Sequence, residues 1–205
     1  MAYLTTTAAV KTQLGLHGTV NGTLNDNADD DSLIGAYVAQ ATQIFNSEVG
    51  YTFIATNGTL ELDACAPHAY GRKLFFRQPV VGVYSVVNGD GQTLTESEYR
   101  LLPANETPKY GIEIKQGSGK YWNYDTSPEA AIVIGGTLGY ATEANIPADV
   151  TLAVTKLAAN LYQNRDNKGE VIRFADGSSQ VPADAPGIIF KVIENYSYTQ
   201  IKVYA

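Results

Sequence analysis

The sequence predicts an α+β fold: a small helical bundle frame with an inserted antiparallel β domain and a C-terminal extended arm. Amphipathic three- and four-residue periodicity on both sides of the middle of the 205-residue chain predicts the frame. Short strand-like runs separated by Asn-Gly and Asp-Gly turn signals predict the β domain. We therefore expect residues 1–50 and 146–196 to form the frame, residues 51–145 the insertion and residues 197–205 the arm.

Two helices are expected before the β domain. Residues 5–14 would form a short helix capped by Thr5 or Thr6, because an N-cap hydroxyl accepts a hydrogen bond from the first turn. Residues 32–49 would form a longer helix. Its inward stripe would consist of Leu33, Ile34, Tyr37, Val38, Ala41, Ile44 and Phe45. The acidic loop 17–31 lacks the later ligands of a calcium loop, so we interpret its carboxylates as solvated or helix-capping groups.

The middle of the chain predicts short antiparallel strands. The expected strands are residues 51–55, 59–63, 73–76, 80–87, 92–94, 99–102, 112–115 and 130–134. Asn57-Gly58 and the run from Asn88 to Gly91 are interpreted as hairpin turns, because Asn, Asp and Gly accept the positive φ that tight turns require.

The most strongly patterned helix is expected from Pro147 to Lys168. Proline suits the first helical turn, and Asp149 favours the positive end of the helix dipole. The apolar stripe consists of Val150, Ala153, Val154, Leu157, Ala158, Leu161 and Tyr162. This stripe is explained by core packing, whereas the polar end from Tyr162 to Arg165 is not fully explained by it.

The remaining residues predict less regular structure. Residues 169–180 are expected to form a hairpin or flap, and residues 188–194 suit either a helix or a strand. Residues 197–204 alternate as a strand would. That strand could pair within its own domain or with the sheet edge of another protein.

Composition disfavours several classes of function. The formal net charge is −7 and no segment is a basic patch, so tight binding of DNA or RNA is disfavoured. The single Cys65 excludes an internal disulfide and a zinc site built from several thiolates. No stretch approaches the roughly 18 apolar residues that span a bilayer. We expect no cofactor, no metal and no membrane partner.

Candidate catalytic groups are few. Cys65 lies near His68 in the sequence, which leaves the nucleophile–base pair of a small hydrolase as one alternative. The run from Gly117 to Lys120 is similar to a phosphate-binding loop, but Tyr121 stands where that loop needs Ser or Thr. We interpret this run as a turn.

Aromatic residues offer a second alternative. We expect Tyr121, Trp122 and Tyr124 to be exposed, where they could stack on sugar rings, as in a carbohydrate- or receptor-binding β module. The same residues would equally suit a contact between protein subunits.

Four stretches, in this order, resemble a known family. They are YLTTTAAVKTQLGL, DNADDDSLIGAYVAQATQIFNSEVGYTF, LFFRQPVVGVYSVVNGDGQTLTESEYRLL and IVIGGTLGYATEANIPADVTLAVTKLAANLYQNRD. The chain resembles the head-tail connector (adaptor) proteins of tailed phages, the gp6-like family. The loop 17–31 is longer than the turn usual in that family, and residues 181–205 match its final helix and arm only loosely.

The resemblance implies a non-enzymatic structural subunit of the virion neck, made in the host cytoplasm. Copies would form a homo-oligomeric ring, about twelvefold, that binds the portal protein and a stopper or tail-completion protein around a DNA channel. DNA would pass without specific binding, consistent with the net negative charge. The residues expected at the subunit interface are Tyr162, Arg165 and Arg173. The residues expected to dock on the portal are Tyr198, Ile201, Val203 and Tyr204.

Overall fold

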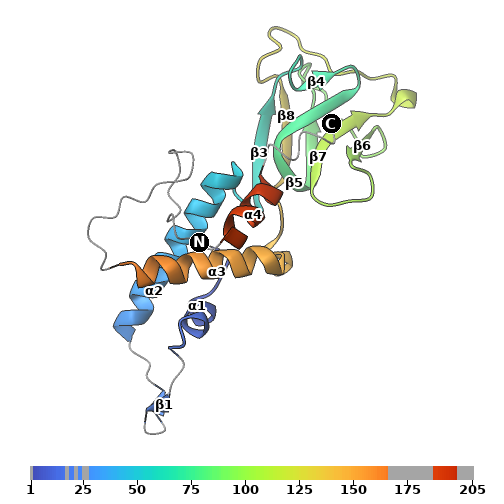
Figure 1. Ribbon diagram of the computed structural model, residues 1–205. Coiled ribbons are helices and arrows are strands. Elements are labelled where there is room, and N and C mark those ends of the chain that lie inside the picture. Colours follow the sequence, from blue (N-terminus) through green and yellow to red (C-terminus); the bar gives the residue numbers. More distant parts are fainter. Residues whose placement is uncertain (1, 17–18, 21–22, 25–27, 166–186, 198–205) are drawn as a thin grey trace. The chain divides into compact units, whose positions relative to one another are not determined.

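The computed structural model describes residues 2–16, 19–20, 23–24, 28–165 and 187–197 (Figure 1). The chain divides into two compact units. The helical unit contains the described residues of Met1–Gly50 and Asn145–Gln200, and the β unit contains Tyr51–Ala144. With four helices and a six-stranded antiparallel sheet in the described residues, the expected α+β fold class is confirmed.

The helical unit is organised around one helix. Its elements are α1 (Thr7–Gln13), α2 (Ala28–Val49), α3 (Ala148–Gln163), α4 (Gly187–Tyr196) and a two-stranded ladder of β1 (Thr19–Val20) and β2 (Thr23–Leu24). α3 contacts α1, α2 and α4, as Figure 1 shows. The seven residues of its predicted apolar stripe are all buried, which confirms that prediction.

The bounds of the first two helices differ in part from those predicted. Thr6 caps α1, and its side-chain oxygen accepts the N–H of Ala9 at 3.1 Å, so one of the two predicted caps is confirmed. α2 begins at Ala28 rather than Ser32, because carboxylates in a first turn stabilise the positive end of a helix. Leu33, predicted to point inward, is 39% exposed, so that assignment was wrong.

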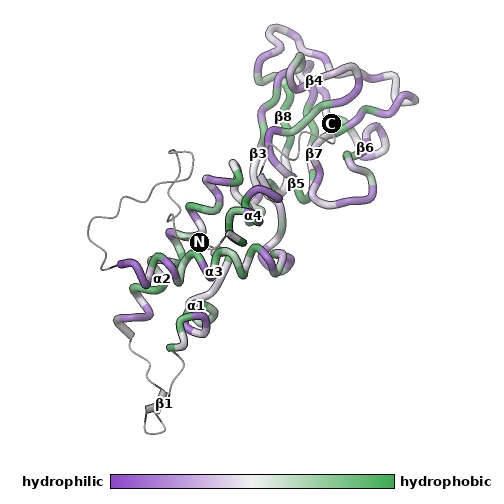
Figure 2. The backbone as a smooth tube through the Cα atoms, viewed as in Figure 1, coloured by the Kyte–Doolittle hydropathy of each residue, from purple (hydrophilic) through white to green (hydrophobic). Residues whose placement is uncertain are grey.

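The later helices also correct the prediction. α3 ends at Gln163 with Asn164 as its C-cap, earlier than the expected end at Lys168. Residues 187–196, which overlap the run that suited either a helix or a strand, form α4 and bury Ile189, Val192 and Ile193. Figure 2 shows α4 and β8 as predominantly hydrophobic segments. The hairpin expected at 169–180 lies outside the described residues, as does the strand expected at 197–204 apart from Ser197.

The β unit is one antiparallel sheet. Its strands are β3 (Thr56–Leu62), β4 (Ala69–Tyr70), β5 (Lys73–Val87), β6 (Tyr99–Leu102), β7 (Lys109–Ile114) and β8 (Ile132–Leu138). They follow the order β3-β8-β5-β7-β6, and β4 pairs with β5. The buried core of the sheet consists of Leu62, Leu74, Phe76, Val80, Val86, Leu94, Tyr99, Ile112, Ile114, Trp122, Ile132 and Ile134.

β5 is one long strand where two were predicted. Its first part pairs with β7 and its second part with β8, and the register shifts between Phe75 and Val80, where the partner changes. Pro79 lies at this change. Proline has no N–H to donate, and its carbonyl accepts the N–H of Gly139 at 2.9 Å, so the strand continues through it.

One of the two predicted hairpins is wrong and one is confirmed. Asn57 and Gly58 lie within β3, because they pair with Thr137 and Gly136 of β8. The run from Asn88 to Gly91 does turn the chain. There the N–H of Gly91 donates to the carbonyl of Asn88 at 2.9 Å, and Val87 faces Thr93 across an antiparallel bridge.

None of the described helices is both long and apolar enough to cross a membrane.

Candidate interaction surfaces

The C-terminal end of α3 places Tyr162 inside the helical unit. Its side chain is only 8% exposed, and its ring meets that of Tyr37 edge-on at 6.1 Å between centroids. Its hydroxyl donates a long hydrogen bond, 3.5 Å, to Oδ1 of Asp30 in α2. Tyr162 therefore joins α2 to α3, and most of its surface is taken up within one subunit.

Arg165 presents the exposed part of the same end. Its guanidinium carbon lies 4.1 Å from the centre of the Tyr162 ring, and its Nη1 donates to the carbonyl of Tyr162 at 2.9 Å. A guanidinium over a tyrosine face gains a cation–π attraction and is held in a fixed place. The residue is exposed.

The other residues predicted at the interfaces lie outside the described residues. They are Arg173, Tyr198, Ile201, Val203 and Tyr204. Their roles stay predictions.

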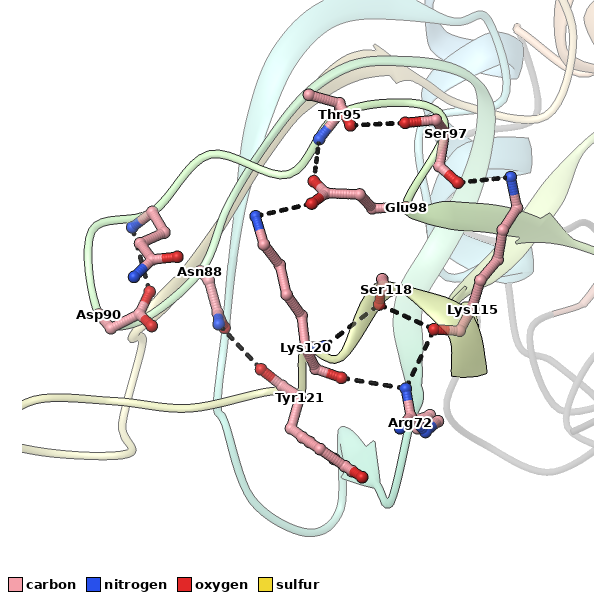
Figure 3. A network of polar contacts seen from close by, with 11 residues as sticks. Arg72, Asn88, Asp90, Thr95, Ser97, Glu98, Lys115, Ser118, Lys120 and Tyr121 are labelled. Atoms are coloured by element: carbon pink, nitrogen blue, oxygen red, sulfur yellow. Dashed lines mark hydrogen bonds and ion pairs between the residues drawn. The ribbon is translucent and has the colours of Figure 1, made fainter.

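A second candidate surface lies on the β unit, where Arg72 organises the segment from Lys115 to Trp122 (Figure 3). Nη1 of Arg72 donates to the carbonyls of Lys115 at 3.0 Å and Lys120 at 3.1 Å. Its guanidinium carbon lies 4.2 Å from the centre of the Tyr121 ring. The ring of Tyr121 is thereby oriented although 59% of the residue is exposed.

Glu98 ties this segment to the preceding loop. Its Oε2 accepts the N–H of Thr95 at 2.8 Å and its Oε1 pairs with Nζ of Lys120 at 2.9 Å, both drawn in Figure 3. The Thr95 N–H, followed by the Lys120 ammonium, lowers the pKa of the Glu98 carboxyl below its ordinary value. The ionised form of Glu98 therefore stabilises the loop.

Gly89 allows the next part of the segment to approach the Asn88–Gly91 turn. A bridge joins Gly89 to Tyr124, and the amide of Asn88 donates to the carbonyl of Tyr121 at 2.9 Å. A Cβ atom on Gly89 would lie 2.4 Å from the carbonyl oxygen of Asn123. Only glycine therefore fits at this position without a shift of the backbone.

The aromatic residues of the segment do not form one exposed set. Trp122 is only 9% exposed, and its Nε1–H donates to the carbonyl of Arg72 at 2.9 Å. The assumption that Trp122 is exposed was therefore wrong, because the indole belongs to the core and has its hydrogen-bond partner there. Tyr121 and Tyr124 are exposed, as is Tyr70 near Arg72.

Tyr84 covers glycines on another part of the sheet. A Cβ on Gly135 of β8 would lie 2.7 Å from Cε2 of Tyr84, so the ring occupies the space that a side chain there would fill. The hydroxyl of Tyr84 donates to the carbonyl of Gly58 in β3 at 3.3 Å. An aromatic ring packed over a strand glycine restores contacts that the glycine itself lacks. Tyr84 thus joins three strands.

His68 takes part in a polar cluster, and this bears on the hydrolase alternative. Its Nδ1 lies 3.0 Å from Oδ2 of Asp63, and its Nε2 accepts a hydrogen bond from Nε of Arg77. The Ala130 N–H, with the imidazole adding to it, lowers the pKa of the Asp63 carboxyl. Both ring nitrogens of His68 are engaged, so neither is placed to activate Cys65, whose thiol donates to the carbonyl of Ala66.

Within the described residues, no three His, Cys, Asp or Glu side chains gather as they would around a metal ion.

Two residues of this surface, Arg72 and Glu98, were not predicted from the sequence to have a role. Arg72 carried no signal beyond its place next to a glycine turn. The run from Thr95 to Glu98 has the Thr-x-x-Glu spacing of a capping box, in which the carboxylate returns to the backbone N–H of the threonine. That spacing could have revealed Glu98 as a loop-ordering group.

Three solved chains share this fold over most of their length. One, from the neck of an empty gene transfer agent (GTA) particle computed with C6 symmetry, is 22% identical, with a TM-score of 0.57 over 93% of this chain and 88% of that chain. A chain from the neck of the native GTA particle, computed with C12 symmetry, is 18% identical, with a TM-score of 0.53 over 93% and 90%. A chain from the virion of the native particle is 19% identical, with a TM-score of 0.54 over 94% and 91%.

The sequence matches no protein-family profile and no curated protein. The structural likeness establishes the fold, and it does not single out the gp6-like family.

Proposed function

We propose that this chain is a structural subunit of the neck of a tailed phage or phage-like particle, in which copies form a ring that joins the portal to a stopper or tail-completion protein. The observation that carries this proposal is the fold shared with chains of GTA particles along at least 93% of this chain. Two of those chains come from necks computed with sixfold and twelvefold symmetry, which supports a ring of copies.

A closed ring requires a heterologous interface, in which one face of each subunit meets a different face of the next. Arg165 on the helical unit and the exposed rings of Tyr70, Tyr121 and Tyr124 on the β unit suit such an interface, because tyrosine and arginine are enriched in interfaces. We retain Tyr162, Arg165 and Arg173 as proposed subunit contacts. Tyr162 would contribute indirectly, because its ring and its carbonyl hold the Arg165 guanidinium in place.

The charges of the β unit suit a passage for DNA that does not bind it. Its Lys and Arg residues are Arg72, Lys73, Arg77, Arg100, Lys109, Lys115 and Lys120. All but Lys73 donate to described groups of the same unit. Cations engaged in this way are poorly placed to displace counterions from phosphates, so DNA would slide past.

Portal docking is proposed for residues 197–205, with Tyr198, Ile201, Val203 and Tyr204 as the contacting side chains. Strand addition to the portal would give affinity through main-chain hydrogen bonds. Deleting residues 197–205 is expected to leave the fold intact and to abolish portal binding. Binding that survives the deletion would assign docking to another segment.

The test of the whole proposal is electron microscopy of the protein mixed with its portal. An additional ring beneath the portal supports the proposal. The absence of any complex at high protein concentration would overturn it. A monomeric mass for the free protein would not contradict the proposal, because the ring can form only once the subunits bind the portal. The microscopy experiment then decides. The role is structural rather than enzymatic, in the virion neck, after synthesis in the host cytoplasm.

The alternative of a carbohydrate- or receptor-binding module is favoured by the exposed rings of Tyr70, Tyr84, Tyr121 and Tyr124. The burial of Trp122 removes the strongest stacking residue from that set. Calorimetric titration of glycans against the wild type and Tyr121→Ala separates the two functions, since only a glycan-binding module would show heat that the substitution abolishes.

A further inference from the structure

Among the residues that the structure describes, β3 lies at an edge of the β-unit sheet. It pairs with β8 through seven consecutive residue pairs, from Thr56 opposite Leu138 to Leu62 opposite Ile132, without a shift of register. No strand of the described residues pairs with its other side. Such an edge offers a row of backbone N–H and C=O groups to any extended chain.

The opposite edge of the sheet is protected and β3 is not. β6 has four residues, carries the charged Arg100 and is followed directly by Pro103. Shortness, charge and proline are devices that keep an edge strand from pairing with another chain. β3 has seven residues, contains no proline, lysine or arginine, and carries one charged side chain, Glu61. β3 is therefore the edge that can receive a strand.

The side chains of β3 indicate what would fit beside it. Leu62 is buried in the core and Leu60 packs against it, whereas Glu61 between them is exposed. Because successive side chains of a strand point to opposite faces, an added strand should place apolar residues beside the leucines. A cation opposite Glu61 would complete the match, since opposite charges across two strands attract.

The sequence of residues 198–204 has this pattern. It reads Tyr-Thr-Gln-Ile-Lys-Val-Tyr, which is rich in β-branched and aromatic residues. Lys202 stands between Ile201 and Val203, as Glu61 stands between Leu60 and Leu62. Both three-residue runs have a charged residue between two apolar ones, and the two central charges are opposite.

We propose that residues 198–204 of one copy add as a strand to the β3 edge of a second copy, with Lys202 opposite Glu61. This contact rests on the proposed ring, because a repeated head-to-tail contact generates a ring when the rotation between neighbouring copies closes. An added strand keeps an outer edge of its own. The same segment can therefore hold the next subunit on one side and pair with the portal on the other.

Cross-linking of the full-length chain tests the contact. Cys65→Ser first removes the exposed native thiol. One preparation then carries Glu61→Cys and a second carries Lys202→Cys, and the two are mixed and mildly oxidised without portal. Residues opposite each other on paired strands are close enough for a disulfide. The matched control replaces Glu61→Cys with Arg100→Cys on the protected edge.

We expect the covalent heterodimer to form roughly tenfold faster with position 61 than with position 100, because docking raises the local thiol concentration. Equal rates would overturn the proposal. A chain that carries both Glu61→Cys and Lys202→Cys should give a ladder of covalent multimers. Oxidation to an intramolecular disulfide alone would overturn the assignment to a second copy. Since portal is absent, either failure is distinct from a failure of the ring to form beneath the portal.

Discussion

The guanidinium carbon of Arg72 lies 4.2 Å from the centre of the Tyr121 ring. The main-chain oxygen of the same arginine accepts the Nε1–H of Trp122 at 2.9 Å. One residue of the turn between β4 and β5 therefore holds two successive aromatic residues, the first exposed and the second buried. The orientation of the exposed Tyr121 ring depends on this arrangement.

Replacing Arg72→Lys should lower the free energy of unfolding by about 1–2 kcal/mol, because lysine cannot donate to two carbonyls and stack on a ring in one planar geometry. Chemical denaturation followed by the fluorescence of Trp122, the single tryptophan, measures the change. The control is Lys73→Ala at the exposed neighbouring position, expected within about 0.5 kcal/mol of the wild type. Equal stabilities of the two variants would show that other contacts hold the segment.

Gly89→Ala should destabilise the protein by about 1–3 kcal/mol, because the new methyl group would overlap the backbone of Asn123 and force it to move. Gly117→Ala is the matched control, since no atom lies within 4 Å of a Cβ there, and it should change stability by less than about 0.5 kcal/mol. Thermal unfolding of both variants gives the comparison. A Gly89 variant as stable as the Gly117 variant would contradict the close approach.

Acidification should weaken the loop that Glu98 orders. The pKa of Glu98 is lowered in the folded state, so the stability it contributes is present above the pKa of the unfolded chain and is lost as the pH falls through the folded pKa. Glu98→Gln should therefore be less stable than the wild type at pH 7 and should lose less stability between pH 7 and pH 3.

Urea unfolding at both pH values measures this difference. Asp63 also has a lowered pKa, so part of the pH dependence should remain in the Glu98→Gln variant. Glu96→Gln, at an exposed neighbouring position, is the control and should keep the wild-type dependence. An identical dependence in all three proteins would exclude a role for Glu98.

At the end of α3, we expect substitution of Tyr162 to lower folding stability and substitution of Arg165 to reduce ring assembly. Tyr162→Ala should cost about 3 kcal/mol of folding stability, because the ring is buried against Tyr37. Arg165→Ala should cost at most about 1 kcal/mol, as expected for an exposed cation–π contact, but should reduce ring assembly. Gln163→Ala, at an exposed position nearby, is the control for assembly. Rings of Arg165→Ala that form as readily as wild-type rings would remove Arg165 from the interface.

Local periodicity was sufficient to predict that α1, α2 and α3 are helices, whereas it left the run that forms α4 open between helix and strand. The stripe of α3 from Val150 to Tyr162 is buried as expected, because a helix brings residues three and four apart to one face wherever it lies. The cap at Thr6 follows from the same local chemistry. The prediction that Leu33 points inward was wrong because periodicity does not define the width of the buried face. Its neighbour Ile34 is fully buried.

The sequence by itself determined the α+β class, the helical stripes and the turn from Asn88 to Gly91, because these depend on residues close together in the chain. Tertiary structure alone decided that Asn57-Gly58 lies within a strand, since its partners Thr137 and Gly136 are distant in sequence and outweigh the local turn preference. It also decided which of two adjacent aromatic residues is buried. Trp122 is placed by a carbonyl of a residue 50 positions away, a contact that no local pattern encodes.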